Sequence, residues 1–171
     1  MSRKDNGSGS RSPAWLRGDE RRAWLAYMGV QLRLNYEMNR QLQIDSGLSL
    51  ADYDVLNALN DVPGQCLQVT ALSALIGWER SRLSHHARRM QQRGLVRCDL
   101  SASDGRATEI KLTAAGRKAI VDAAPGHVAL VRKLFFGGMP KELLGSLCDA
   151  FEAVYDHILE NGTLPSPRSD G

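Results

Sequence analysis

WERSRLSHHARRM, residues 78–90, combines arginines, serines and two adjacent histidines with a few apolar residues. These residue types occur in metal sites, in catalytic clusters, on solvated helix faces and on surfaces that read DNA. If Arg80 to about Gln92 forms a helix, then Leu83, Ala87 and Met90 fall on one side of it, because steps of four and three residues match the helical repeat. The arginines and serines then lie largely on the outer surface. The segments on either side of this helix decide between the four uses.

A short helix is predicted before this stretch, over Ala71–Ile76, with Thr70 as its N-cap and Gly77 as the turn that follows it. Its residues expected to point inward are Leu72, Leu75 and Ile76. Further upstream, Gln65–Val69 is compatible with a small strand.

After the stretch, Gly94 ends the helix and the apolar pattern changes from helical to alternating. Leu95–Cys98 and Ala107–Leu112 are predicted strands of a hairpin with Asp104-Gly105 at or near its tip. Helix, turn, helix, strand, turn and strand, in this order, are the plan of a winged helix-turn-helix. In this plan the second helix is held at the surface, where arginine can bind a guanine edge and serine can reach a base or a phosphate. A merely solvated helix is the alternative.

Further helices are predicted upstream of this unit. The first runs from Asp19 to about Asp45, and Gly47 can end it. Ser49 is predicted to cap the next helix, with Asp52 at the third position also binding free N–H groups.

The C-terminal part is predicted to be helical from Thr113, its cap. Pro125-Gly126 is expected to kink or break this helix, because proline loses a helix hydrogen bond and clashes with the preceding turn; the helix then resumes from about Val128 to Phe136. The last helix carries an apolar stripe at steps of three and four, formed by Leu144, Leu147, Phe151, Val154 and Ile158. This stripe can serve as a dimer surface, as part of an intrachain core, or as both.

These elements predict a mainly α fold of the α+β class. Residues 1–18 are expected to be a disordered basic tail and residues 161–171 a flexible C-terminal tail. Residues 47–112 form the winged helix-turn-helix DNA-binding lobe. Residues 19–46 and 113–160 form an N/C-terminal helical dimerisation region.

Basic charge is concentrated in the middle of the chain. Between Glu79 and Arg117 there are nine lysines or arginines and four acidic residues, although the whole chain carries only +3. This favours an anionic partner, with a solvated basic face as the alternative. The three cysteines are far apart without a CxxC, no apolar run approaches the roughly 18 to 20 residues of a membrane span, and there is no signal peptide. We therefore expect a cytoplasmic protein without a membrane partner.

Four short motifs now follow one another at set intervals: Trp78-x-x-Ser81-Arg82-Leu83-Ser84-His85, Arg93-Gly94-Leu95-Val96-Arg97, Asp104-Gly105-Arg106-Ala107 and Leu112-Thr113-x-x-Gly116-Arg117. Each alone is weak, but together they closely resemble the MarR family of transcriptional regulators, over about residues 20–160. The segment from Gly47 to Leu56 also resembles the entry to the second helix in actinobacterial-type members.

The resemblance implies a homodimeric, ligand-responsive repressor that binds palindromic double-stranded DNA with its recognition helix in the major groove. Arg106 matches the wing arginine that enters the minor groove, where a narrow groove concentrates negative potential, and Asp104 matches a wing acid that steadies it. The full set expected at the DNA is Ser81, Arg82, Ser84, His85, Arg88, Arg89, Asp104 and Arg106. An alternative of another class is a module that binds a small molecule or a protein without specific DNA binding.

Family members often bind small aromatic or phenolic effectors between the dimer region and the winged lobe. Residues that could line such a cleft here are Trp24, Tyr27, Met28, Tyr36 and Tyr53. Core packing is the alternative, and it is favoured for most of them.

Few residues of this sequence are suited to metal binding, catalysis or thiol chemistry. His85 and His86 point about 100° apart on a helix and do not easily share a metal; His85 fits DNA contact, and His86 is expected to be partly inward. No metal site or cofactor is expected. Without a phosphate loop, nucleophile elbow, HExxH or paired-carboxylate motif, no enzyme is predicted. Cys98 stands where the family more often has a second basic residue; a quiet strand cysteine is favoured over a reactive thiol beside Arg97.

Overall fold

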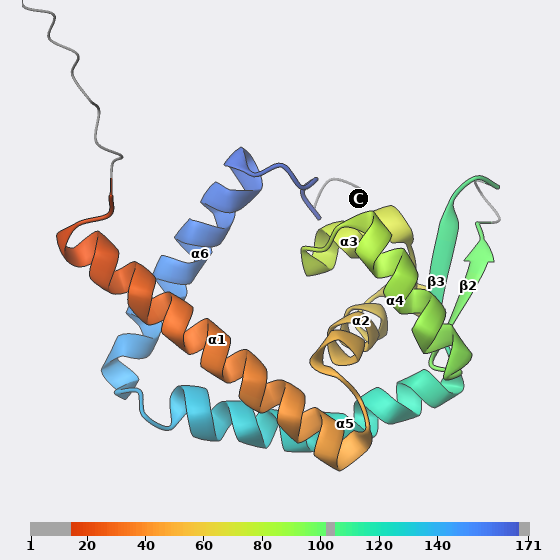
Figure 1. The fold of residues 1–171 in the computed structure, drawn as a ribbon, viewed down its shortest axis with the longest axis horizontal. Helices are drawn as coiled ribbons and strands as arrows, with labels where there is room; N and C mark the ends of the chain where they lie inside the picture. The colour runs from red at the N-terminus through yellow and green to blue at the C-terminus, as the bar shows by residue number, and fades with distance from the viewer. Residues whose placement is uncertain (1–14, 102–104, 168–171) are drawn as a thin grey trace, which may run out of the picture. The chain divides into compact units, whose positions relative to one another are not determined.

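The computed structural model describes residues 15–101 and 105–167, and they form a mainly helical fold with one small sheet (Figure 1). The chain divides into two compact units, Met1–Arg33 and Leu34–Gly171. Helix α1, Gly18–Ser46, belongs to both, and its bounds agree with the predicted helix. Its part before Leu34 exposes large apolar side chains, and the rings of Trp24 and Tyr27 lie 5.6 Å apart.

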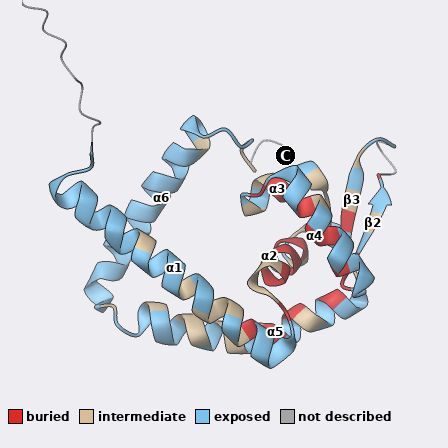
Figure 2. Ribbon diagram, in the orientation of Figure 1, coloured by how far each residue is buried: buried red, intermediate tan, exposed pale blue. Residues whose placement is uncertain are grey.

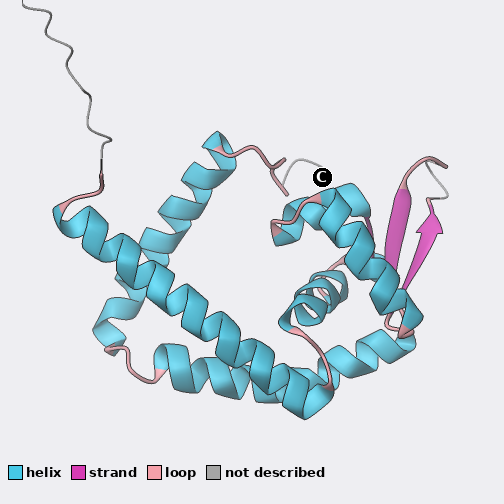
Figure 3. Cartoon of the chain, viewed as in Figure 1, coloured by secondary structure: helices cyan, strands magenta, loops and turns pink. Residues whose placement is uncertain are grey.

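The second unit contains the winged lobe. Its helices are α2 (Leu50–Asn60), α3 (Val69–Ile76) and α4 (Arg80–Gln92), and its strands are β1 (Cys66–Gln68), β2 (Val96–Leu100) and β3 (Thr108–Leu112). The three strands form an antiparallel sheet in the order β1-β3-β2, as the magenta arrows of Figure 3 show for the β2–β3 hairpin. The predicted hairpin and the small third strand are therefore confirmed. The predicted tip of the hairpin, at Asp104, lies outside the described residues.

The core lies beneath α4. Buried residues, red in Figure 2, gather on α2, α3, α4 and the inner side of the hairpin. Leu83, Ala87 and Met90 are all buried, which confirms the predicted inward face of the recognition helix. They pack in one cluster with residues such as Leu56 and Ile110. This packing holds α4 at the surface with its polar side outward.

Caps and glycines set the helix ends as predicted at most positions. Ser49 Oγ accepts from the Asp52 N–H at 3.0 Å, while the Asp52 carboxylate accepts from the Ser49 N–H at 2.9 Å, so both halves of the capping box are present. Gly47, Gly77 and Gly94 each have a φ of about +70°, where a side chain would be strained.

Two expectations for α3 are wrong. Thr70 is not the N-cap, because the helix begins at Val69, two residues earlier than predicted and directly after β1, and Thr70 lies inside its first turn. Leu75 is not inward: it is 41% exposed, while Ser73 is buried and donates to the Thr70 carbonyl at 2.9 Å. The inward side of this short helix therefore includes Leu72 and Ile76, as expected, but Ser73 in place of Leu75.

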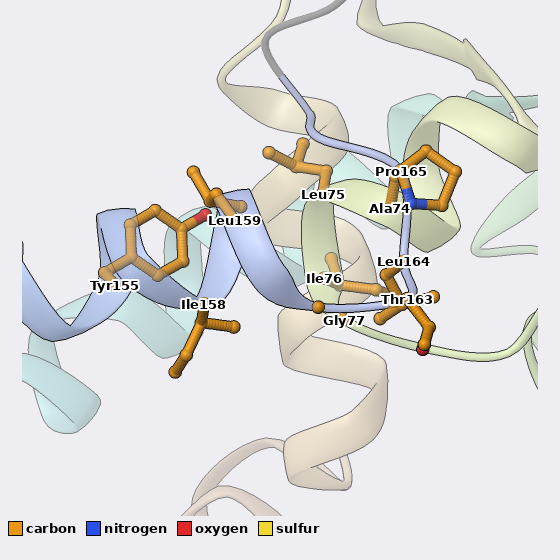
Figure 4. Close-up of a pocket in the computed structure, with 11 residues that line it drawn as sticks. Ala74, Leu75, Ile76, Gly77, Tyr155, Ile158, Leu159, Thr163, Leu164 and Pro165 are labelled. Carbon is orange, nitrogen blue, oxygen red and sulfur yellow. The ribbon is translucent and has the colours of Figure 1, made fainter.

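Leu75 instead lines an apolar hollow of about 480 Å³ at the end of α6, Leu144–Asn161. Figure 4 shows this hollow, which is lined by Leu75 and Ile76 from α3 and by Tyr155, Leu159 and Leu164 from the C-terminal part of the chain.

Of the break or kink expected at Pro125, the break is wrong. Helix α5 runs without a break over Ala114–Val131, with Pro125 inside it, and continues as a π-helical turn over Arg132–Phe136. The neighbouring Gly126 lies close to α1: a Cβ there would be 2.9 Å from Gln41 Nε2. The absence of a side chain at Gly126 thus allows this close approach to α1.

The apolar stripe of α6 is exposed in the single chain. Phe151, Val154 and Ile158 are 48%, 58% and 57% exposed, so the stripe does not fill an intrachain core. Such a contiguous apolar face on a helix favours contact with a partner. Among the described residues, no helix is both long and apolar enough to span a bilayer.

Candidate nucleic-acid interface

The outer side of α4 presents a polar surface opposite the core. At about 100° per residue, Ser81, His85 and Arg88 lie farthest from Leu83 and Met90, and all three are exposed. Ser84 is half-buried, and its Oγ donates to the Arg80 carbonyl at 2.8 Å. The predicted outward direction of Ser81, His85 and Arg88 is thus confirmed.

Arg82 lies on one flank of α4 and stacks on Trp78. Its guanidinium carbon is 4.0 Å from the centroid of the indole ring, and Trp78 itself is only 7% exposed. A planar guanidinium on an aromatic face is partly preorganised. Asp54 lies in the same region: burial raises the pKa of its carboxyl, and the charge of Arg82 partly opposes this.

His86 lies beneath the same flank and is buried, at 8% exposure. Its Nε2 is 3.0 Å from Asp52 Oδ1, and its Nδ1 is 3.0 Å from Nη2 of Arg89. Its ring also meets Trp78 edge to face, with 5.4 Å between centroids. The expectation that His86 is partly inward is confirmed, and Arg89 is tied to it.

Asp52 joins this cluster to the end of the helix. Arg93 donates to Asp52 Oδ2 at 2.7 Å and to the Gly47 carbonyl at 2.9 Å. Burial raises the pKa of Asp52, but the nearby His86 ring and the hydrogen bonds from Ser49 and Arg93 outweigh this effect and hold the pKa well below its ordinary value. Asp52 is therefore a buried carboxylate that is charged at neutral pH.

A shallow hollow lies between the start of α4 and the wing. It brings Arg106 together with Ser81 and Ser84, which are predicted DNA contacts, and with Arg80 and Thr70, which the sequence reasoning did not select. Asp104 lies outside the described residues. Backbone N–H groups at a helix start and nearby arginines are typical of phosphate sites.

Sequence reasoning missed two features of this interface. The contact between Asp52 and His86 joins residues 34 positions apart, and only the capping pattern at Ser49 marked Asp52 as special. Arg80 and Thr70 were missed because they come from different helices. The positions of both at helix starts were the available signal.

Metal ligation and thiol reactivity are the other chemistry open to the titratable residues. Over residues 15–101 and 105–167, no group of three or more His, Cys, Asp or Glu could hold a metal ion. Burial and the charge of Asp99 raise the pKa of the Cys98 thiol, while Arg97 pairs with Asp99 at 2.7 Å. The quiet thiol interpretation of Cys98 is thus supported.

The five aromatic and methionine residues considered for an effector cleft divide by burial. Tyr53 is buried, and its ring lies 4.3 Å from that of His127 on α5. Trp24, Tyr27 and Tyr36 are 50%, 45% and 63% exposed, so these three do not pack in the core of the single chain. Met28 is half-buried.

Comparison with known proteins gives a consistent result. Residues 46–107 match the sequence profile of the MarR family. Sco3205, a MarR family transcriptional regulator from Streptomyces coelicolor solved in complex with DNA, is 32% identical, with a TM-score of 0.81 over 90% of this chain and 100% of that one. AbsC, a MarR family regulator from the same organism, is 32% identical, with a TM-score of 0.78 over 84% and 97%.

A more distant match shows the fold alone. The organohalide-sensing regulator RdhR-CbdbA1625, solved with 2,4-dichlorophenol bound, is 17% identical, with a TM-score of 0.76 over 92% of this chain and 94% of that one. Comparison with curated protein sequences gives no match.

Proposed function

This chain belongs to the MarR family of transcriptional regulators, and on that premise we propose that it is a cytoplasmic repressor that binds a palindromic DNA site as a homodimer. The observation that carries the proposal is the surface of α4. A buried stripe anchors this helix while hydroxyls, a histidine and arginines face outward beside a wing that bears Arg106. The DNA complex of Sco3205, which shares this fold, supports the assignment.

The geometry suggests different tasks for the polar side chains of α4. Ser81, His85 and Arg88 project farthest and would meet base edges in the major groove. Arg82 and Arg89 lie on one flank, each against a protein ring, and would bind phosphates along one groove edge.

The wing and the helix starts would bind the adjacent backbone. Arg106 would enter the minor groove, and Arg80 and Thr70 in the same hollow would bind the phosphates beside it.

Dimerisation would use the exposed stripe of α6. Replacing Phe151 by Glu is expected to weaken the dimer by about 2 kcal/mol or more, because it places a charge in an apolar interface. Ser146, on the opposite side of the same helix, offers a matched control: Ser146→Glu adds the same charge and is expected to leave the dimer intact. Sedimentation equilibrium measures both variants. Equal dimer stability in the Phe151→Glu variant and the unaltered protein would exclude this face.

Effector response is the finer part of the proposal. The regulator that shares the fold and is solved with 2,4-dichlorophenol suggests small aromatic molecules as the class to try. Trp24, Tyr27, Met28, Tyr36 and Tyr53 are the side chains proposed to contact one, and such a ligand would act only by binding the DNA-free arrangement of the lobes more tightly.

The experiment that tests the function is selection of genomic DNA fragments by the purified protein, repeated with candidate phenols. We expect recovery of a palindrome whose half-sites are one helical turn or a multiple of it apart, because a two-fold dimer presents two identical helices. Recovery of fragments with no shared sequence would reject specific DNA binding.

A further inference from the structure

We propose that His86 positions Arg89 for DNA phosphate contact, and that Asp52 does so indirectly by fixing which nitrogen of His86 carries the proton. This inference rests on the proposed function, since it assigns a supporting residue to the same surface. It gives a task to the one buried histidine of WERSRLSHHARRM, a residue that does not itself reach the surface.

The first step is the contact between His86 and Arg89. The guanidinium Nη2 lies 3.0 Å from His86 Nδ1. An arginine has only N–H donors, so Nδ1 must be the acceptor and must be without a proton. A neutral imidazole in this arrangement carries its proton on Nε2.

The second step is what lies on the other side of the ring. Nε2 lies 3.0 Å from Asp52 Oδ1, out of line for a hydrogen bond, and this carboxylate is almost wholly buried, with 3% of its side chain exposed. Through its charge alone, a buried anion favours a proton on the nearer of the two nitrogens. Asp52 therefore stabilises the same tautomer that Arg89 requires, as a carboxylate often does for an imidazole whose second nitrogen is in use.

The third step is the geometry of the flank. The His86 ring also meets Trp78 edge to face, and Trp78 carries the guanidinium of Arg82 at 4.0 Å. Arg82 and Arg89, two helical turns apart on α4, thus each contact one of two neighbouring buried rings. A guanidinium that is already held loses less conformational freedom when it binds a phosphate than one that is mobile in solvent.

Two substitutions separate the two nitrogens. In His86→Asn, the side-chain oxygen can occupy the place of Nδ1 and accept from Arg89, but nothing reaches Asp52. In His86→Gln, the longer amide can occupy the place of Nε2 and donate to Asp52, but no acceptor remains for Arg89. Both variants are polar and shorter than or similar in length to histidine, so each serves as the control for the other.

The DNA test uses random-sequence duplex DNA titrated at several NaCl concentrations, with thermal melts to establish that each variant is folded. Arg89→Ala and His86→Gln are each expected to lower binding about fivefold per subunit near 0.15 M salt and to reduce the slope of log affinity against log salt by about one per subunit. His86→Asn is expected to keep the slope. The double variant His86→Gln with Arg89→Ala is expected to match Arg89→Ala alone.

Two outcomes would overturn the inference: a folded His86→Gln variant with the unaltered salt slope, or losses that add in the double variant. A second measurement does not involve DNA. The ¹⁵N spectrum of the His86 ring is expected to report a proton on Nε2 in the unaltered protein and a mixture of tautomers in Asp52→Asn. A proton on Nδ1 in the unaltered protein contradicts the inference. Absence of DNA binding by the unaltered protein would instead count against the proposed function, and the ring spectrum would still decide the tautomer.

Discussion

Replacing Arg82 and Arg106 together by alanine is expected to abolish specific operator binding while the dimer persists. Both side chains are exposed, one on the flank of α4 and the other in the wing hollow. A dimer would lose four guanidinium contacts. At about 1 kcal/mol or more each, the loss is about 4 kcal/mol, which corresponds to about a thousandfold in affinity. Fluorescence anisotropy with the selected operator at fixed salt measures this loss.

The control must remove the same charge elsewhere. Arg40 and Arg132 are exposed on α1 and on the turn that follows α5, away from α4 and the wing. The double variant Arg40→Ala with Arg132→Ala is expected to bind the operator within about fivefold of the unaltered protein, because only long-range attraction changes. Operator affinity that falls equally in both double variants would mean that net charge, and not the groove contacts, controls binding.

Local sequence patterns correctly predicted the buried side of α4 and the helix ends near it. Leu83, Ala87 and Met90 could be placed inward because helical spacing and burial are linked within one element. Ser49 and Gly47 could be placed at helix ends for the same reason, since capping depends on residues a few positions apart.

Errors arose where an element depends on its neighbours in space. Leu75 was expected inward because it is apolar. Only a few residues of a short helix can face the core, and in α3 Ser73 is buried there while Leu75 is exposed. Pro125 was expected to kink or break α5, but the helix is not broken there, and its next residue, Gly126, lies close to α1.

The aromatic residues show the same limit for function. Trp24 and Tyr36 are exposed in the single chain, and only a partner or a ligand could cover them. The spacing of residues along the sequence does not reveal a partner or a ligand. The support of Arg89 by His86 and Asp52 likewise depends on a contact between α2 and α4 that no short motif contains.

Replacing Asp52 by Ala is expected to lower the free energy of unfolding by about 3 kcal/mol at neutral pH. The capping box at Ser49 contributes about 1 kcal/mol of this, and the remaining ~2 kcal/mol comes from leaving the buried Nε2 of His86 without a polar neighbour. The contribution of Arg93 is small, because its side chain is 45% exposed and screened by water. Urea unfolding at a fixed protein concentration measures the change, since a dimer's stability depends on concentration.

The pH dependence identifies the carboxylate as the cause. Because the folded state holds the pKa of Asp52 below the unfolded value of about 3.9, its stabilisation is fully present above that pH and is lost as the pH falls further toward the folded pKa. The difference in stability between the unaltered protein and Asp52→Asn should therefore be constant near neutrality and narrow below about pH 4. Asp61, an exposed carboxylate at the end of α2, is the matched control, and Asp61→Asn should change stability by less than about 0.5 kcal/mol. A difference for Asp52→Asn that stayed constant through this acid range would show that shape and hydrogen bonding, and not the buried charge, hold α2 against the recognition helix.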